Sequence, residues 1–199
     1  MSRIRDVMIK KGGSSHCRTT DEPTGKSLET LVRHYIKICR PRLSSELKYF
    51  EKIQPFSEVL EKASMAINKN GKRFDHQRRL TSASLEGSKV CLSKVINPLK
   101  ACKNFAELHD LLEKLLHDVH GIGELYCYDT ALRLGAFLGI YPELVYLHRG
   151  TRDGAKALGL DWRSKTLDLK IFPQPLQKLK PHEIEDFLCI YKKYLFQKD

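Results

Sequence analysis

The chain of 199 residues lacks any hydrophobic run long enough to cross a membrane. Such a span is built from roughly 18 or more consecutive apolar residues. The basic amino terminus, residues 1–11, has no apolar segment behind it, which argues against a secretory signal. We therefore expect a cytoplasmic protein without a membrane partner.

Cysteine is sparse, and no two cysteines stand in a close pair. The six are at positions 17, 39, 91, 102, 127 and 189. In a chain of this length without a secretory signal, we expect reduced and mostly buried thiols. No two Cys or His residues at finger or ribbon spacing lie next to another such pair. We therefore expect no metal site and no cofactor.

Strand-like alternation of apolar and polar residues is nearly absent, with 167–171 as the one candidate. Hydrophobic residues make up 41% and charged residues 30%, a soluble globular balance. Helical periodicity is frequent, so the predicted class is all-α, a helical bundle. Residues 1–23 carry no such periodicity and are expected to be a flexible basic arm, which leaves 24–199 as a single α-helical domain.

Apolar spacing predicts a first helix that stops before Pro41, and Ser44 and Ser45 are suitable caps for a second one. The stripe of the first helix is Leu28, Leu31, Val32, Tyr35, Ile36 and Cys39.

Further helices are predicted along the rest of the chain. Residues 84–99 form the least distinct of them. Asn104, with Glu107 three residues later, has the pattern of a capping box at the start of a strongly apolar helix. Pro181 suits the first position of the last helix.

Positive charge is concentrated in the first half of the chain. Residues 1–100 hold 21 Lys and Arg against 10 Asp and Glu, whereas residues 101–199 hold 14 of each sign. A one-sided basic balance is typical of a surface that faces a polyanion. Self-repulsion that keeps a basic protein soluble is the alternative explanation.

The densest cationic cluster lies beside a predicted turn at Asn70-Gly71. It consists of Lys69, Lys72, Arg73, Arg78 and Arg79. A loop with this composition can contact phosphates, and it can equally be a solvated loop.

A tight reversal is predicted at Val119-His120-Gly121-Ile122-Gly123-Glu124, between two apolar helices, the first of which should end near Asp118. Two glycines let the chain turn sharply and approach a ligand closely. Ile122 can fill the gap between the helices. The second helix then directs its first N–H groups outward, where they favour a phosphate.

This pattern, near residues 104–139, resembles the helix-hairpin-helix motif. That family uses the motif for sequence-independent contacts to the DNA backbone, often with a monovalent cation held by hairpin carbonyls. The resemblance implies that Gly121, Ile122, Gly123 and Glu124 form a phosphate-facing turn, with Tyr126 nearby.

The resemblance extends over residues 104–162 to the helix-hairpin-helix DNA glycosylases. Val145, His148 and Leu158-Gly159-Leu160 match the segment that follows the hairpin in that superfamily. Its catalytic aspartate would fall on Tyr146 and the lysine of its bifunctional members near Leu125, and neither residue can perform that chemistry. The carboxyl end also lacks the four cysteines of an iron–sulfur cluster.

A few other side chains are candidates for chemistry. Asp129, His148 and Asp153 are the weak catalytic candidates, with structural ion pairing or hydrogen bonding as the simpler explanation. Arg149 and Arg152, at the start of a predicted helix, suit phosphate or base recognition.

The leading hypothesis is a DNA-binding protein that grips backbone phosphates, with a role in base-excision repair left open. Its expected contacts include Lys72, Arg73, Arg78, Arg79, Arg149 and Arg152. The alternatives are a helical adaptor for an acidic protein and a binder of structured RNA.

Overall fold

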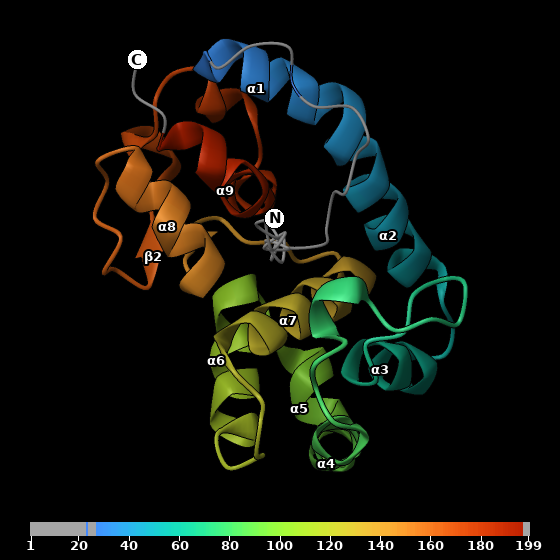
Figure 1. Cartoon of the computed structure of the whole chain (residues 1–199). Coiled ribbons are helices and arrows are strands. Elements are labelled where there is room, and N and C mark those ends of the chain that lie inside the picture. Colours follow the sequence, from blue (N-terminus) through green and yellow to red (C-terminus); the bar gives the residue numbers. More distant parts are fainter. Residues whose placement is uncertain (1–22, 24–26, 197–199) are drawn as a thin grey trace, which may run out of the picture.

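The computed structural model describes Pro23 and residues 27–196, so the predicted arm at 1–23 falls almost entirely outside the described residues. The molecule is mostly helical, with 65% of the chain in helices and one very small two-stranded sheet, which confirms the predicted helical class. Figure 1 shows the helices gathered into two groups, one above the other.

Two hydrophobic clusters correspond to these groups. The first, here called the hairpin lobe, contains the second half of α2 and helices α3 to α7. The second, here called the terminal lobe, contains α1, α8, α9 and strand residues Val145 and Leu167. Consecutive residues of the 145–147 segment contact different lobes, because Tyr146 belongs to the first cluster whereas Val145 and Leu147 belong to the second.

Helix α1 (Leu28–His34) continues into α2 (Arg40–Lys52) through a π-helical segment, Tyr35–Cys39. The expected stop before Pro41 is wrong. Within the π-helical segment the N–H of Arg40 bonds to the carbonyl of Tyr35, five residues earlier. This wider turn brings Pro41 into the first turn of α2, where a missing N–H costs nothing. Ser44 and Ser45 consequently lie inside α2 and cap no helix.

The remaining helices of the hairpin lobe follow in order. They are α3 (Phe56–Ser64), α4 (Ser82–Ser93), α5 (Ile96–Ala101), α6 (Phe105–Leu116) and α7 (Glu124–Leu138). The stretch predicted as one helix at 84–99 is divided between α4 and α5. The predicted cap of α6 is confirmed, since the Asn104 side chain accepts from the N–H of Glu107 at 2.9 Å. Helix α6 ends at Leu116, two residues before the expected end.

The terminal lobe is built from both ends of the described chain. Strand β1 (Val145–Tyr146) pairs antiparallel with β2 (Thr166–Leu167), and the predicted strand at 167–171 continues as a 3-10 turn, Leu169–Ile171. Helix α8 (Arg149–Ala157) packs against α9 (Pro181–Leu195), which begins at the proline predicted for its first position. Gly154 permits this approach, because a Cβ there would lie 2.6 Å from the carbonyl oxygen of Leu188.

Candidate nucleic-acid interface

The connection between α6 and α7, residues 117–123, is here called the hairpin turn. The N–H of Ile122 bonds to the carbonyl of Val119 at 3.1 Å, and Gly121 has a φ of +82°. A positive φ at this position of a β-turn favours glycine. Gly121 and Gly123 are exposed, whereas Ile122 is partly buried against the core of the hairpin lobe, as predicted from its sequence position.

Helix α7 begins directly after the hairpin turn, with Gly123 as its N-cap. No side chain of the described residues caps this end, and a Cβ on Gly123 would meet no atom within 4 Å. The first amides of a helix have no carbonyl partner inside it and carry partial positive charge. The start of α7 is therefore an open site at which N–H groups can bind an anion.

One carboxylate lies close to that opening. Glu124, the first residue of α7, accepts two hydrogen bonds from Arg152 of α8, at 2.6 and 3.0 Å. These bonds lower the pKa of the Glu124 carboxyl. The guanidinium of Arg152, which was predicted as a nucleic-acid contact, is thus paired with Glu124, and this ion pair joins α8 to the start of α7.

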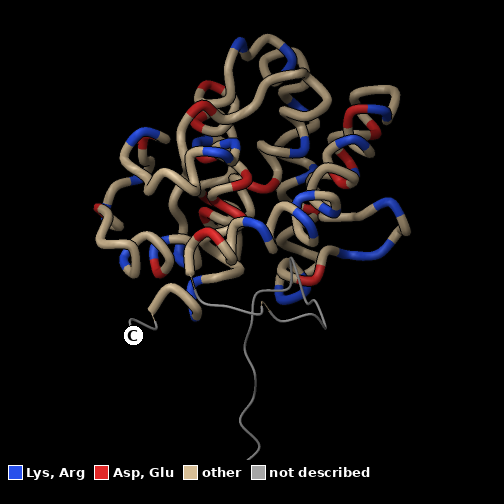
Figure 2. Tube along the Cα trace, turned by 90° about the horizontal axis from the view of Figure 1, so that it is seen from above, with Lys and Arg blue, Asp and Glu red and all other residues tan. Residues whose placement is uncertain are grey.

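The second cationic element is the basic loop, residues 69–79. The side-chain oxygen of Asn68 accepts from the N–H groups of Asn70 and Lys72, at 2.9 and 3.2 Å, and Gly71 has a φ of +71° at the tip. Figure 2 shows this loop projecting from one side of the molecule, with Lys and Arg along it. Its exposed cations are Lys69, Lys72, Arg78 and Arg79.

Two other features reduce the charge that the loop presents. Arg78 forms an ion pair with Asp75. Arg73 is partly buried and donates to the carbonyl of Leu80 at 2.9 Å. Among the predicted contacts in the basic loop, Lys72 and Arg79 are therefore the cations most accessible to a phosphate.

The inner side of the basic loop is held by α7. His76 and Gln77 both bond to the same carboxylate oxygen of Asp129, at 2.6 and 2.8 Å. Arg133, one turn further along α7, donates to Gln77 at 3.1 Å and to Glu46 of α2 at 3.2 Å. These bonds fix the loop against the helix that starts at the hairpin turn.

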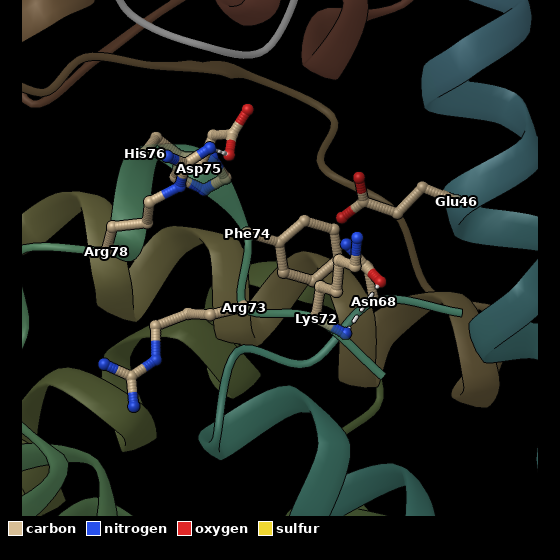
Figure 3. A pocket seen from close by; sticks show the side chains of 8 residues that line it. All are labelled: Glu46, Asn68, Lys72, Arg73, Phe74, Asp75, His76 and Arg78. Atoms are coloured by element: carbon tan, nitrogen blue, oxygen red, sulfur yellow. Dashed lines mark hydrogen bonds and ion pairs between the residues drawn. The ribbon is translucent and has the colours of Figure 1, made fainter. Parts of the chain in front are cut away.

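A hollow of about 400 Å³ lies beside these anchors. Figure 3 shows Glu46 reaching into it from α2, opposite Phe74 and Asn68, while Arg73 extends away. Burial raises the pKa of the Glu46 carboxyl, although Arg133 opposes the shift. The hollow is lined by side chains of both signs, with Glu46 and Asp75 beside Lys72, Arg73 and Arg78.

The start of α4 links the two elements. Thr81 caps α4 by accepting from the N–H of Ser84 at 3.0 Å, and Leu80 just before it accepts from Arg73. The Ser84 hydroxyl in turn lies where a Cβ on Gly121 would meet it at 2.9 Å. The basic loop and the hairpin turn therefore flank one short segment, residues 80–84.

Tyr126, predicted near the phosphate-facing turn, lies in the core with 3% of its surface exposed. Its hydroxyl donates to the carbonyl of Ser64 and bonds to the hydroxyl of Ser88, each at 2.6 Å. Burial raises its pKa to about 12. The ring has no face available for a base, so we leave Tyr126 out of the interface. Arg149, by contrast, is exposed at the first position of α8.

The structure separates the three catalytic candidates. Asp153 is exposed on α8 and pairs with Lys192 of α9 at 3.3 Å. Asp129 and His148 are buried, and the charge of Asp129 acts on His148. His148 also bonds to the buried carboxylate of Glu185. Although burial opposes its charge, Glu185 raises the pKa of His148.

Other members of this buried polar cluster have almost no signal in the sequence. Tyr35 donates to Asp186 at 3.1 Å, and burial raises the pKa of Tyr35 well above its usual value. The one sequence signal is the acidic pair Glu185-Asp186 beside apolar residues on the same helix.

Thr151 is a residue type suited to capping α8. In the structure His148 is the N-cap, and the Thr151 hydroxyl accepts from its N–H at 2.7 Å.

Comparisons with protein-family models, with curated proteins and with solved structures found no match. Within the described part of the chain, no helix combines the length and apolar character of a membrane span. Geometry and charge are therefore the basis for assigning a function.

Proposed function

We propose that this protein binds duplex DNA through backbone phosphates, using the hairpin turn, the open start of α7 and the outer side of the basic loop. The observation that carries the proposal is the placement of the hairpin turn and the basic loop on either side of residues 80–84. A phosphate at the start of α7 would then have cationic side chains within the same contact surface.

The shape of this region supports the motif inferred from the sequence. Helices α6 and α7 pack together, Ile122 lies between the turn and the core, and Gly121 takes the positive φ that a tight reversal needs. We therefore propose that residues 105–138 form a helix-hairpin-helix. Such a unit contacts the sugar–phosphate backbone, so we expect slight sequence preference.

The proposal is restricted to binding. Tyr146, at the position of the glycosylase aspartate, is buried with its ring packed among Phe105, His109 and Tyr128. A phenol in that environment supplies no carboxylate, and burial raises its pKa further.

A matched pair of substitutions tests the start of α7. Gly123→Asp and Gly123→Asn place side chains of nearly equal size in open space, and both residues are good N-caps. Only Asp adds a negative charge where the phosphate should lie. With a short fluorescein-labelled duplex and anisotropy detection, we expect Gly123→Asp to bind about tenfold more weakly than Gly123→Asn.

The basic loop is tested by salt dependence. The double variant Lys72→Gln/Arg79→Gln should weaken binding and make the log–log salt slope shallower, by about 0.9 for each phosphate that is no longer neutralised. The control, Lys170→Gln/Lys193→Gln, removes two exposed cations of the terminal lobe and should leave the slope unchanged.

Equal affinities for the Gly123 pair, together with equal slopes for the two double variants, would overturn the proposal. Competition with unlabelled duplex RNA separates the nucleic acids. RNA that displaces the probe as well as DNA does would contradict the assignment to DNA.

A further inference from the structure

A second constellation lies on α6, away from the basic loop. His109, Asp110 and Glu113 each offer a ligand atom, and the three atoms lie within 4.8 Å of one another. The imidazole Nδ1 is 3.9 Å from Asp110, and Nε2 is 3.7 Å from Glu113. One imidazole and two carboxylates are a donor set that binds transition metals such as Zn²⁺ and Mn²⁺.

The histidine supplies an independent observation. Its side chain is 96% buried, and its Nδ1 has no hydrogen-bond partner among the described residues. A buried polar atom is normally satisfied, so an unsatisfied one requires a reason. A metal ion bound at Nδ1 beside Asp110 would satisfy it, with Glu113 as the third ligand of the cluster.

A protein cation now occupies part of this space. The ammonium of Lys165 lies 2.9 Å from Asp110 and 2.8 Å from Glu113 and bridges the two carboxylates. The Lys165 side chain is 52% exposed, and it comes from the segment just before β2. An exposed ammonium that bridges carboxylates contributes little stability, so it can move into solvent when a stronger cation arrives.

The site also has an open side. His109, Glu113 and Lys165 line a cavity of about 250 Å³ between α6, the start of α7 and α8. Reactive zinc sites, unlike purely structural ones, have three protein ligands and leave one coordination position open toward a cavity. Arg152 and Arg163 line the same cavity, so an anion could reach that position.

We propose that His109, Asp110 and Glu113 form a binding site for one divalent transition-metal ion, for which the Lys165 ammonium is a resident competitor. The nitrogen donor favours Zn²⁺ or Mn²⁺ over Mg²⁺ and Ca²⁺, which prefer oxygen ligands throughout. The argument for this site does not rest on the proposed DNA contacts, although its cavity borders Glu124 at the start of α7.

Because the Lys165 ammonium competes with the metal ion, removing the ligands should weaken zinc binding, whereas removing Lys165 should strengthen it. The full chain, stripped of metal with a chelator, is titrated with zinc chloride by calorimetry. Asp110→Asn/Glu113→Gln should lose this binding. Lys165→Met removes the competing ammonium but no ligand, so we expect it to bind zinc about tenfold more tightly than the natural protein.

The matched control is Lys114→Met, which removes an exposed lysine from the same helix without touching the site. It should leave the zinc affinity unchanged. The side chains of Asp110 and Glu113 are both accessible to solvent, which makes the ligand variants compatible with folding, and circular dichroism checks this.

Zinc should also raise the melting temperature of Lys165→Met and not that of the ligand variant. Zinc affinity that is unaltered in the ligand variant, or no stronger in Lys165→Met, would overturn the proposal. The zinc titrations contain no DNA, which keeps this result separate from the proposed function.

Discussion

The guanidinium carbon of Arg133 lies 3.9 Å from the centre of the Phe74 ring. Phe74 stands just before the 3-10 turn Asp75–Gln77 of the basic loop, so this contact holds the loop against the middle of α7. Arg133 is almost fully buried and also donates to Glu46 and Gln77, so one cation joins α2, α7 and the loop. Its role is structural.

Replacing Arg133 should therefore destabilise the fold. Arg133→Met leaves the partly buried Glu46 carboxylate without its cation and the buried Gln77 without a donor, and we expect a loss of about 3 kcal/mol in the free energy of unfolding, measured with urea. Arg79→Met, at an exposed position, should change it by less than about 0.5 kcal/mol. Similar values for the two variants would contradict this assignment.

The two glycines of the hairpin turn should respond differently to the same substitution. Gly121→Ser places a side chain at φ +82° and against Ser84, so we expect a loss of about 1–2 kcal/mol. Gly123→Ser enters open space and supplies an N-cap hydroxyl, so stability should be kept or raised by a few tenths of a kcal/mol. Thermal or urea unfolding distinguishes them. A larger loss at Gly123 would refute the prediction.

Tyr126→Phe tests the placement of that ring in the core. Removing the hydroxyl leaves the Ser64 carbonyl and the Ser88 hydroxyl without their partner, which should cost about 1–3 kcal/mol. DNA affinity of the folded variant should stay within about twofold of the natural protein. A selective loss of DNA binding with unchanged stability would return Tyr126 to the interface.

Glu124 places a negative charge at the start of α7, where the proposed phosphate would bind. Glu124→Gln keeps the shape of the side chain and removes that charge, so DNA affinity should increase by severalfold. Arg152 is also released from its strong ion pair. The pair is largely exposed, so stability should change by less than about 1 kcal/mol. Weaker DNA binding by Glu124→Gln would show that the carboxylate serves the interface in another way.

The stability of the protein should fall on acidification through His182. Burial lowers the pKa of this imidazole from 6.5 to about 4. The unfolded chain therefore binds a proton near pH 6.5 that the folded chain refuses until about pH 4. As the pH is lowered between those two values, the burial of the uncharged His182 should reduce the free energy of unfolding by up to about 3 kcal/mol. His182→Phe, which can still pack against Tyr141, should show a smaller fall in urea stability over this range. Parallel profiles for the two proteins would exclude the effect.

Local signals in the sequence predicted local structure well. Asn104 caps α6 as expected, because a cap depends on residues within one turn. Pro181 begins α9 for the same reason. The prediction that the first helix ends before Pro41 was wrong, because the π-helical segment before this residue removes the clash that normally ends a helix.

The buried contacts could not be predicted in this way. Asp129 bonds to His76, which is 53 residues away, and His148 bonds to Glu185, which is 37 residues away. Such pairs form only when segments that are distant in the sequence come together in the fold. The proposed metal ligands His109, Asp110 and Glu113 are close together in the sequence, but the spacing of Cys and His residues gives no signal for a set in which two ligands are carboxylates.

The pairing of α1 with α9 has a consequence for how the molecule is made. His34 of α1 bonds to Tyr191, and Tyr35 directly after α1 bonds to Asp186, so the first helix of the described residues is held by the last one. During synthesis the hairpin lobe can form while α1 still has an uncovered apolar face. The terminal lobe closes only after α9 has left the ribosome, and a nascent chain that stalls before residue 181 exposes Leu31 and Val32 to aggregation and to chaperones.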